Sequence, residues 1–455
     1  MPRRPRPLLL ALALALRLAH GGPLAGAPAL APVDAAAEIR ALLAEPLTAG
    51  SAARLSLLAE PSLRARLLET GVEEGRLEAA RRLPNPTLEV EFLGPSGEGA
   101  DETRTEASIE WDVTAALLTG RRTGAASADL EAARLRAEGA VVARTFAVES
   151  AFHGVRAAKR KLAIARTRAE LAAVVADTAR ALVDAGNAAT LSALREDATR
   201  ERAALALAEA ELAAVEAEER LSILLGAGMV VGVREAVAAI GDEAPPLPAA
   251  APETSSLEDA SVASSLELRE VDARLRAVDA RTRLATAEGR WPDVSLRAST
   301  EREEGSWRIG GGVSIRLPLA DRGQGRLASL DAERRSLEER RRATGAAVGS
   351  AARRAASRLS LAHSRAARYA ASILPRQERI TAETLLHANA MQVGIPALLA
   401  ARDAELAAES AAADADRDYA VALAATTALR SGLRVDAPPN PSLPGNEPAS
   451  IDGGH

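Results

Sequence analysis

The sequence contains no cysteine and very few aromatic residues: three Phe, three Trp and two Tyr among 455 residues. Without cysteine there is no disulfide framework, no thiolate metal site and no lipid anchored through an N-terminal cysteine. Because aromatic side chains are scarce, we expect the apolar surface to be buried in thin helical layers or between subunits. The formal net charge of −5 gives no basic footprint, which argues against nucleic acid as a partner.

Long apolar runs are also missing beyond the N-terminus. Three arginines (Arg3, Arg4 and Arg6) precede an apolar run from Leu8 to Leu16, and small residues follow at 25–27. This order predicts a secretory signal peptide over residues 1–27, and therefore export. A transmembrane anchor is the less favoured alternative, because the run is too short to span a bilayer and ends at Arg17.

The rest of the chain is an internal repeat. Pro86 begins the extended stretch Pro86-Thr87-Leu88-Glu89-Val90, and Pro292, 292 − 86 = 206 residues further on, begins a similar stretch. Ser108-Ile109 and Ser314-Ile315 are related by the same spacing, since 314 − 108 = 206. Each copy then reaches a Gly-Arg pair, at 120–121 and 325–326, that opens a very long helix rich in Ala, Leu, Arg and Glu. A duplicated unit of two strands and two long helices points away from a catalytic domain.

These landmarks predict a division of the chain. The first repeat, 28–225, holds a helix, a β-hairpin at 86–113 and a helical hairpin at 117–225, and a linker follows at 226–262. The second repeat, 263–431, holds a helix, a β-hairpin at 292–317 and a helical hairpin at 326–430. Residues 432–455 are predicted to form a disordered tail because they are rich in Pro, Gly and Asn.

Both β-hairpins alternate apolar and charged residues, and all three Trp lie in or beside them. Aromatic residues favour membrane interfaces, yet four strands are too few to close a barrel in lipid, so several copies would have to share one. A soluble four-stranded sheet explains the alternation equally well. In a barrel, the charged face would line the lumen; its residues are Glu89, Glu91, Glu106, Glu110, Asp112, Arg297, Arg308 and Arg316.

The order of helix, hairpin, very long helix, turn and returning helix, duplicated behind a signal peptide, resembles the outer-membrane efflux protein (TolC) family. The resemblance covers about residues 40–432 and includes Leu83-Pro84-Asn85-Pro86 and Ile315-Arg316-Leu317-Pro318-Leu319. The segments 321–326 (Asp-Arg-Gly-Gln-Gly-Arg) and 394–402 (Gly-Ile-Pro-Ala-Leu-Leu-Ala-Ala-Arg) are most similar to the heavy-metal branch, the CzcC and CusC type.

The resemblance implies a mainly α-helical homotrimer whose protomers each give four strands to one outer-membrane barrel and long helices to a periplasmic tube. It implies a passive duct without cofactors, not an enzyme, which carries cargo such as heavy-metal cations. Its partners would be a periplasmic membrane-fusion adaptor, an inner-membrane pump of the resistance-nodulation-division type, and outer-membrane lipid. The competing function is an exported periplasmic coiled-coil structural or adaptor protein.

In this family the two helical turns form the periplasmic tip. The resemblance therefore implies contact with the adaptor around Gly186, Asn187, Leu194, Met391, Gly394 and Leu398. Drug-exporting relatives carry two aspartates after the second turn, where this chain has Ala397 and Ala400. Nearby charges that would narrow the aperture instead are Arg195, Asp197, Arg402 and Asp403, and an ordinary solvated helix face is the alternative for each of them.

Residues for metal binding or catalysis are few. Outside the two chain ends, His153, His363 and His387 are scattered without a partner cluster, so we predict no metal centre. His387 and Met391, four residues apart, would form at most a two-ligand face, and a surface histidine beside an apolar methionine is the simpler interpretation. The sequence has no nucleophile elbow and no evident pair of general acid and base.

Overall fold

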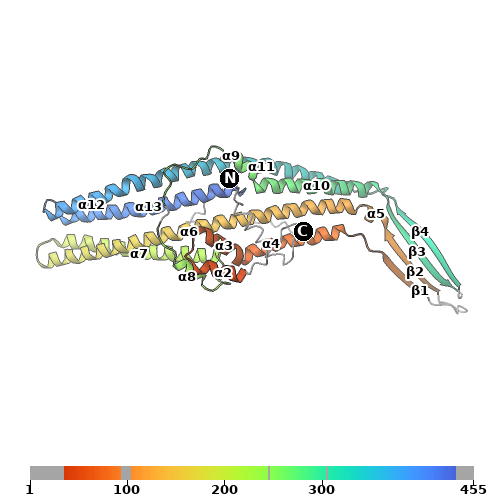
Figure 1. The fold of residues 1–455 in the computed structure, drawn as a ribbon, viewed down its shortest axis with the longest axis horizontal. Helices are drawn as coiled ribbons and strands as arrows, with labels where there is room; N and C mark the ends of the chain where they lie inside the picture. The colour runs from red at the N-terminus through yellow and green to blue at the C-terminus, as the bar shows by residue number, and fades with distance from the viewer. Residues whose placement is uncertain (1–34, 94–103, 244–245, 304–305, 437–455) are drawn as a thin grey trace. The chain divides into compact units, whose positions relative to one another are not determined.

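The computed structural model describes residues 35–93, 104–243, 246–303 and 306–436 (Figure 1). The predicted signal peptide and residues 437–455 of the predicted tail lie outside the described residues. The chain forms two compact units: unit 1 comprises Met1–Arg64, Ala140–Ser265 and Val348–His455, and unit 2 comprises Ala65–Gly139 and Leu266–Ala347. Each unit takes segments from both sequence repeats.

The segment 226–262, predicted as a linker, is partly helical and belongs to unit 1. Three helices contribute to both units: α4 (Pro61–Arg81), α6 (Thr119–Asp184) and α11 (Gln324–Arg368). The helices that belong to unit 1 alone are α2 (Ala35–Ala44), α3 (Ala49–Ala59), α7 (Thr190–Leu224), α8 (Val233–Ala238), α9 (Leu257–Ser264), α12 (Leu374–Asn389) and α13 (Ile395–Arg430).

Two helical hairpins follow the two repeats, with α7 returning beside α6 and α13 returning beside α12 (Figure 1). The 66 residues of α6 correspond to a length on the order of 100 Å. In the second hairpin a π-helical turn, Tyr369–Ile373, separates α11 from α12. Pro375 accounts for this turn, because it has no N–H to donate to the carbonyl of Ala371 and its ring crowds that carbonyl.

One core of unit 1 joins α3, α6, α7 and α8. Leu55, Val148, Leu221 and Val237 are each fully buried in it. Lys159 on α6 fixes the end of α8, because its Nζ donates hydrogen bonds to the carbonyl oxygens of Ala238 at 2.7 Å and of two neighbouring residues. These are the carbonyls that a helix end leaves without an intrahelical partner.

A half-buried ion pair lies where α3 passes into α4. Glu60 accepts hydrogen bonds from the Ser62 hydroxyl and the Leu63 amide, each at 2.7 Å, and forms an ion pair with Arg144 of α6. Burial opposes ionisation of the carboxyl group, but these donors outweigh it and lower the pKa of Glu60 to about 2. Pro61 is the first residue of α4, as proline at a helix start allows.

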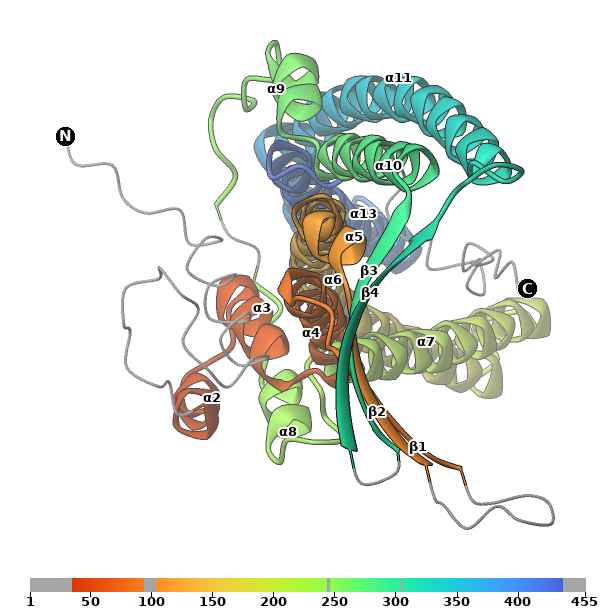
Figure 2. The same cartoon turned by 90° about the vertical axis from the view of Figure 1, so that its right-hand side faces the viewer.

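Unit 2 contains the sheet, together with α5 (Val113–Leu117) and α10 (Leu266–Arg290). The strands β1 (Thr87–Leu93), β2 (Arg104–Asp112), β3 (Asp293–Glu303) and β4 (Ser306–Arg316) pair antiparallel in that order, as one curved ribbon (Figure 2). Beside the sheet, Val278 and Ala285 of α10 pack against Leu330 and Leu337 of α11.

Three consecutive glycines, 310–312, lie inside β4 without a bulge, since the register with β3 runs unbroken through them. A Cβ at Gly310 would lie 3.2 Å from the Ser299 Oγ, which is tighter than an ordinary contact. Glycine at this position therefore lets the two strands approach closely. Among the described helices, none is long and apolar enough to span a membrane.

Candidate functional site

The strand register sorts the side chains of the sheet onto two faces. Successive residues of a strand point to opposite faces, and directly paired residues share a face. All eight strand charges that the sequence predicts on one face are therefore brought together on a single polar face: Glu89, Glu91, Glu106, Glu110, Asp112, Arg297, Arg308 and Arg316.

A row of carboxylates crosses this polar face near the loop ends of the strands. Glu91 is paired with Glu106, and Glu106 with Glu301, which in turn is paired with Arg308 on β4. Like charges directly opposite one another destabilise a sheet, so packing alone does not favour this row. The row sets three carboxylates against the guanidinium of Arg308, so carboxylates predominate in this part of the polar face.

The other end of the polar face is compensated by ion pairs. Arg297 Nη2 lies 2.7 Å from a carboxylate oxygen of Glu110 and Nη1 lies 3.7 Å from Glu89, while the Ser295 hydroxyl donates to Glu110 at 2.5 Å. Gly312 is paired with Arg297 and has no side chain, so it does not hinder the contact of the Arg297 guanidinium with these carboxylates. Arg316 pairs with Asp293 at 3.3 Å.

Asp112 has a local role in addition to its place on the polar face. Its carboxylate accepts a hydrogen bond of 2.6 Å from the amide of Ala115 and so caps α5. Nearby, the Thr114 hydroxyl donates to the carbonyl of Pro292 at 2.9 Å. These contacts fix the end of β2 to the start of β3.

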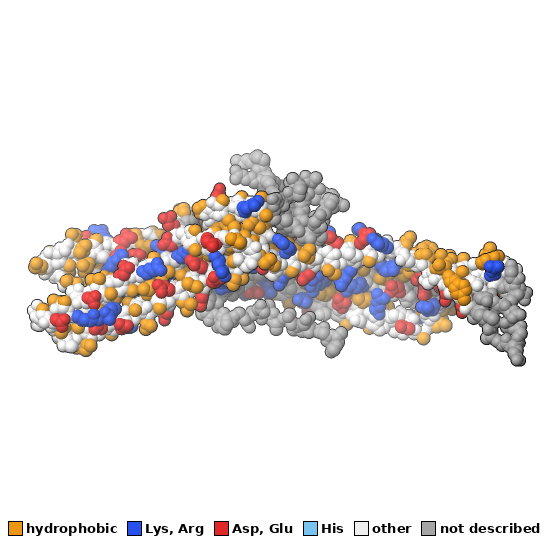
Figure 3. All heavy atoms as spheres, turned by 90° about the horizontal axis from the view of Figure 1, so that it is seen from below, with side chains coloured by type: hydrophobic (Ala, Val, Ile, Leu, Met, Phe, Trp, Pro, Cys, Tyr) orange, Lys and Arg blue, Asp and Glu red, His pale blue; other side chains and the backbone are white. Residues whose placement is uncertain are grey.

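The opposite face of the sheet is apolar and exposed. Ile309 is 89% exposed and Phe92 is 71% exposed, and Figure 3 shows hydrophobic side chains gathered over the strands at its right-hand end. Further exposed side chains of this face are Leu88, Val90, Ile109, Leu296, Trp307, Val313 and Ile315. No described part of the chain covers this face.

Aromatic residues mark both ends of the apolar face. Phe92 and Trp307 lie in the row nearest the loops. Thr105 of β2 is paired with Phe92, and Trp111 lies six residues further along β2, in a second row. At about 3.4 Å per residue the two rows are roughly 20 Å apart. The Trp111 indole N–H donates to the carbonyl of Pro84 at 2.9 Å, and Arg121 lies 4.9 Å from the ring centre of Trp291.

Both helical turns close in the same way. In the first, the amide of Asn187 donates to the carbonyl of Leu182 and that of Gly186 to Val183; in the second, the amides of Gln392 and Met391 repeat the pattern. The central residue of this motif has a left-handed backbone, with φ of 74° at Gly186 and 55° at Met391. Methionine adopts this conformation at a cost that glycine does not have.

The predicted tip residues lie on or beside these turns. Gly186, Asn187 and Gly394 are exposed, Leu194 is 60% exposed, and Leu398 is half-buried. Met391 is 94% exposed, so its strained backbone presents an apolar side chain to the surroundings.

Solved structures with the same arrangement are outer-membrane channels. The outer-membrane channel OprN is 19% identical, with a TM-score of 0.69 over 90% of this chain and 98% of that chain. VceC, an outer membrane protein of Vibrio cholerae, is 15% identical, with a TM-score of 0.66 over 88% and 97%. The chain has the fold of an outer-membrane channel. The predicted mainly α-helical fold with a small sheet is thereby confirmed, and the resemblance stated above is confirmed at the level of the fold.

CusC is 15% identical, with a TM-score of 0.61 over 86% of this chain and 92% of that chain. Its crystal structures describe conformational changes that accompany folding and transmembrane channel formation. CusC is thus no more similar than OprN or VceC, and the structural comparison does not single out the heavy-metal branch. No protein-family model and no curated protein sequence matches this chain.

Three of the four predicted aperture charges form ion pairs within the chain. Arg180 donates to Asp197 at 2.5 Å, and this hydrogen bond raises the pKa of Arg180. Arg168 of α6 lies 2.8 Å from Asp403 of α13. Arg402 pairs with Glu405 at 2.5 Å, whereas Arg195 is exposed.

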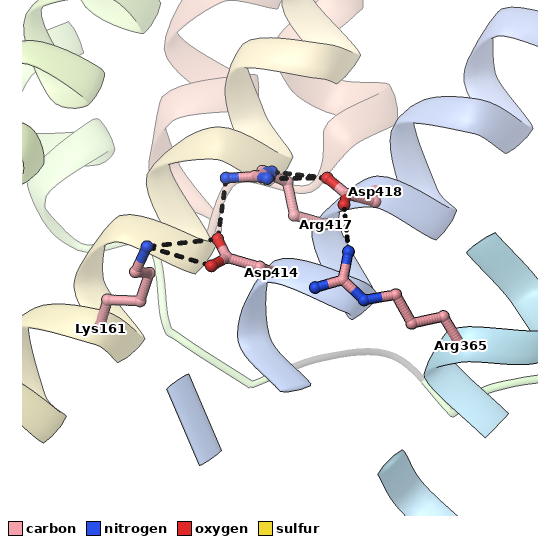
Figure 4. A network of polar contacts seen from close by, with 5 residues as sticks. All are labelled: Lys161, Arg365, Asp414, Arg417 and Asp418. Carbon is pink, nitrogen blue, oxygen red and sulfur yellow. Dashed lines mark hydrogen bonds and ion pairs between the residues drawn. The ribbon is translucent and has the colours of Figure 1, made fainter. Parts of the chain in front are cut away.

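Further ion pairs connect α6 and α11 to α13 (Figure 4). Lys161 lies 3.1 Å from Asp414, which also accepts from Arg417 at 3.0 Å. Arg417 continues to Asp418, and Arg365 of α11 reaches the same carboxylate at 3.2 Å. Together with the Arg168–Asp403 pair, this network ties the first helical hairpin to the second inside unit 1.

In the described part of the chain no group of three or more His, Asp or Glu side chains is placed to hold a metal ion. His387 Nδ1 lies 2.5 Å from the side-chain oxygen of Gln392, next to Met391. His153, on α6, has its pKa lowered to about 4 by burial and by Arg156, so it is neutral at physiological pH.

Sequence reasoning missed Glu301 as a member of the polar face, although the predicted hairpin at 292–317 includes it. The strand β3 runs to Glu303, so Glu301 lies within it. Ser299 and Glu301 keep the two-residue period, which was the signal available in the sequence.

Proposed function

We propose that the chain is one protomer of a trimeric outer-membrane channel, a passive conduit from periplasm to exterior in a tripartite export system. The observation that carries the proposal is the sheet, whose apolar face is exposed between two aromatic rows while its other face is charged. Lipid on one side and water on the other is the environment that such a sheet requires.

The dimensions of the apolar face support insertion in lipid. Outer-membrane barrels carry an apolar band about 25 Å tall with aromatic residues at both boundaries. The two aromatic rows, roughly 20 Å apart, and the aliphatic residues between them match that pattern.

The strand edges support assembly from several copies. In the four-stranded sheet of the described residues, β1 and β4 are the two edges. Open edges are prohibitively costly in hydrocarbon, so β4 of one copy must pair with β1 of the next. The resemblance supports three copies and a periplasmic location for the long helices.

The polar face would then line the lumen. The carboxylate row at Glu91, Glu106 and Glu301 would favour cations. We expect that reversing Glu106 and Glu110 to Lys lowers cation selectivity in planar-bilayer conductance. Unchanged selectivity would place these side chains outside the conduction path.

The helical turns are the proposed contact with a periplasmic adaptor, which would couple the channel to an inner-membrane pump. Met391 supports this role, because a fully exposed apolar side chain on a strained backbone is better explained by a partner than by stability. Arg195, Asp197, Arg402 and Asp403 are the proposed aperture charges, three of them held by the ion pairs described above.

Heavy-metal cations are the proposed cargo, on the strength of the motifs at 321–326 and 394–402. A passive conduit needs no resident metal and no cofactor, since selection of the cargo falls mainly to the pump. In this proposal the chain performs no catalysis.

Migration on a denaturing gel tests the proposal against a periplasmic structural protein. We expect the chain in outer-membrane fractions, as an oligomer that runs differently before and after heating. A monomer released without detergent into the periplasmic fraction would contradict the channel.

A further inference from the structure

A single arginine lies on the apolar face of the sheet. Side chains of that face alternate along each strand, and among the described strand residues Arg302 of β3 is the only charged one on it. Its side chain is exposed. A charge on a face that consists mainly of aliphatic and aromatic residues calls for a physical reason, because such a charge is costly in lipid.

Strand pairing places Arg302 in the outermost row of this face. Phe92 is paired with Thr105, Thr105 with Arg302, and Arg302 with Trp307, so these four side chains form one line across the sheet. This line is the aromatic row nearest the loops. The next row inward is uncharged and consists of Val90, Ala107, Thr300 and Ile309. The charge therefore lies at the edge of the apolar band.

The Arg302 guanidinium packs on an indole ring. Its central carbon lies 5.7 Å from the ring centre of Trp307, within the range over which an aromatic face attracts a cation. Arg297 on the polar face differs, since it lies 2.7 Å from a carboxylate oxygen of Glu110. In the described part of the chain Arg302 forms no ion pair. The indole covers one flat side of the guanidinium and leaves its N–H edges available to an anion.

The outermost row corresponds to the headgroup level of a bilayer. Tryptophan favours the boundary between lipid and water, and a charge on a lipid-facing surface is tolerated near that boundary but not at the midplane. Phosphate oxygens of headgroups accept paired hydrogen bonds from a guanidinium. Charge complementarity therefore favours an anionic headgroup at Arg302, with its acyl chains along the apolar face.

We propose that Arg302 and Trp307 bind the phosphate of an anionic lipid headgroup at the loop end of the sheet. This site rests on the channel proposed above, because only a sheet inserted in lipid brings a headgroup to Arg302. It adds to that channel a preference for lipid of one charge. Solvation of Arg302 by water alone would give no such preference.

Fluorescence quenching in proteoliposomes of the full-length chain tests the site. The probes are phosphatidylglycerol and phosphatidylcholine, each brominated on the acyl chains, because bromine quenches a nearby indole. The Trp307 signal of each protein is its difference from the same protein carrying Trp307→Phe. We expect phosphatidylglycerol to bind at Trp307 about fivefold more tightly than phosphatidylcholine, the ratio that one basic side chain near an anionic surface provides.

Two variants test the assignment to Arg302. Arg302→Gln should remove the preference while brominated phosphatidylcholine still quenches Trp307, which shows that the sheet remains in lipid. Arg121→Gln is the matched control, because Arg121 also packs on an indole, 4.9 Å from the ring centre of Trp291, outside the row of Trp307. A preference that survives in Arg302→Gln, or that is lost equally in Arg121→Gln, would overturn the site.

The same measurement distinguishes failure of this site from failure of the channel. Equal quenching of Trp307 by both lipids in the unaltered chain would overturn the anionic site and leave the channel standing. Quenching by neither lipid would show that Trp307 does not contact lipid, which contradicts the channel and the site together.

Discussion

The core of unit 1 and the apolar face of the sheet use the same kinds of side chain with opposite results. In unit 1, Leu55 and Leu221 are fully buried because α3, α6, α7 and α8 converge on them. In unit 2, Ile309 and Phe92 remain largely exposed because none of the described residues packs over that face. Unit 1 satisfies its apolar surface internally, whereas the sheet requires a medium or a partner from outside.

Truncating one leucine in each region is the strongest test of this comparison. Leu221→Ala should lower the free energy of unfolding by about 2–5 kcal/mol, because a fully buried side chain leaves a cavity. Leu88→Ala, at a position 69% exposed in the chain, should cost well under about 1 kcal/mol in detergent. Denaturant unfolding of the detergent-solubilised protein measures both, and equal losses would remove the distinction.

An acid titration sharpens the comparison, because only unit 1 depends on the Glu60–Arg144 pair. The pKa of Glu60 is about 2 in the folded chain against an ordinary value of 4.5, so its stabilisation is complete above about pH 4.5 and disappears as the pH falls toward 2. Glu60→Gln should cost about 2 kcal/mol at neutral pH.

The pH dependence of unfolding provides the check on Glu60. The difference between the unaltered chain and Glu60→Gln should shrink steadily below about pH 4.5. A difference that stays constant down to pH 2 would show that the carboxylate charge contributes nothing.

Much of the fold was predictable because its patterns are local. The alternation at 87–92 and 106–113 predicts β1 and β2, although Val113 already belongs to α5. Pro61 and Gly186 predict helix boundaries at Pro61–Arg81 and near Asp184. The resemblance, rather than periodicity, identified the fold class. The division into two repeats describes the sequence, while packing gathers pieces of both repeats into each unit.

The features that escaped prediction depend on contacts between distant segments. Nothing local in Lys159 indicates that it holds the end of α8, about eighty residues away. Glu301 was missed for a different reason, since Thr300 beside it is polar and hides the alternation of β3.

The central claim is that lipid covers one face of the sheet and water the other, and single cysteines in this cysteine-free chain test it directly. Val313 and Ser314 are adjacent and both exposed in β4, on the apolar and polar face respectively. In proteoliposomes, a membrane-impermeant maleimide should label Ser314→Cys and spare Val313→Cys. Equal labelling of both variants would contradict a sheet that lies between lipid and a water-filled lumen.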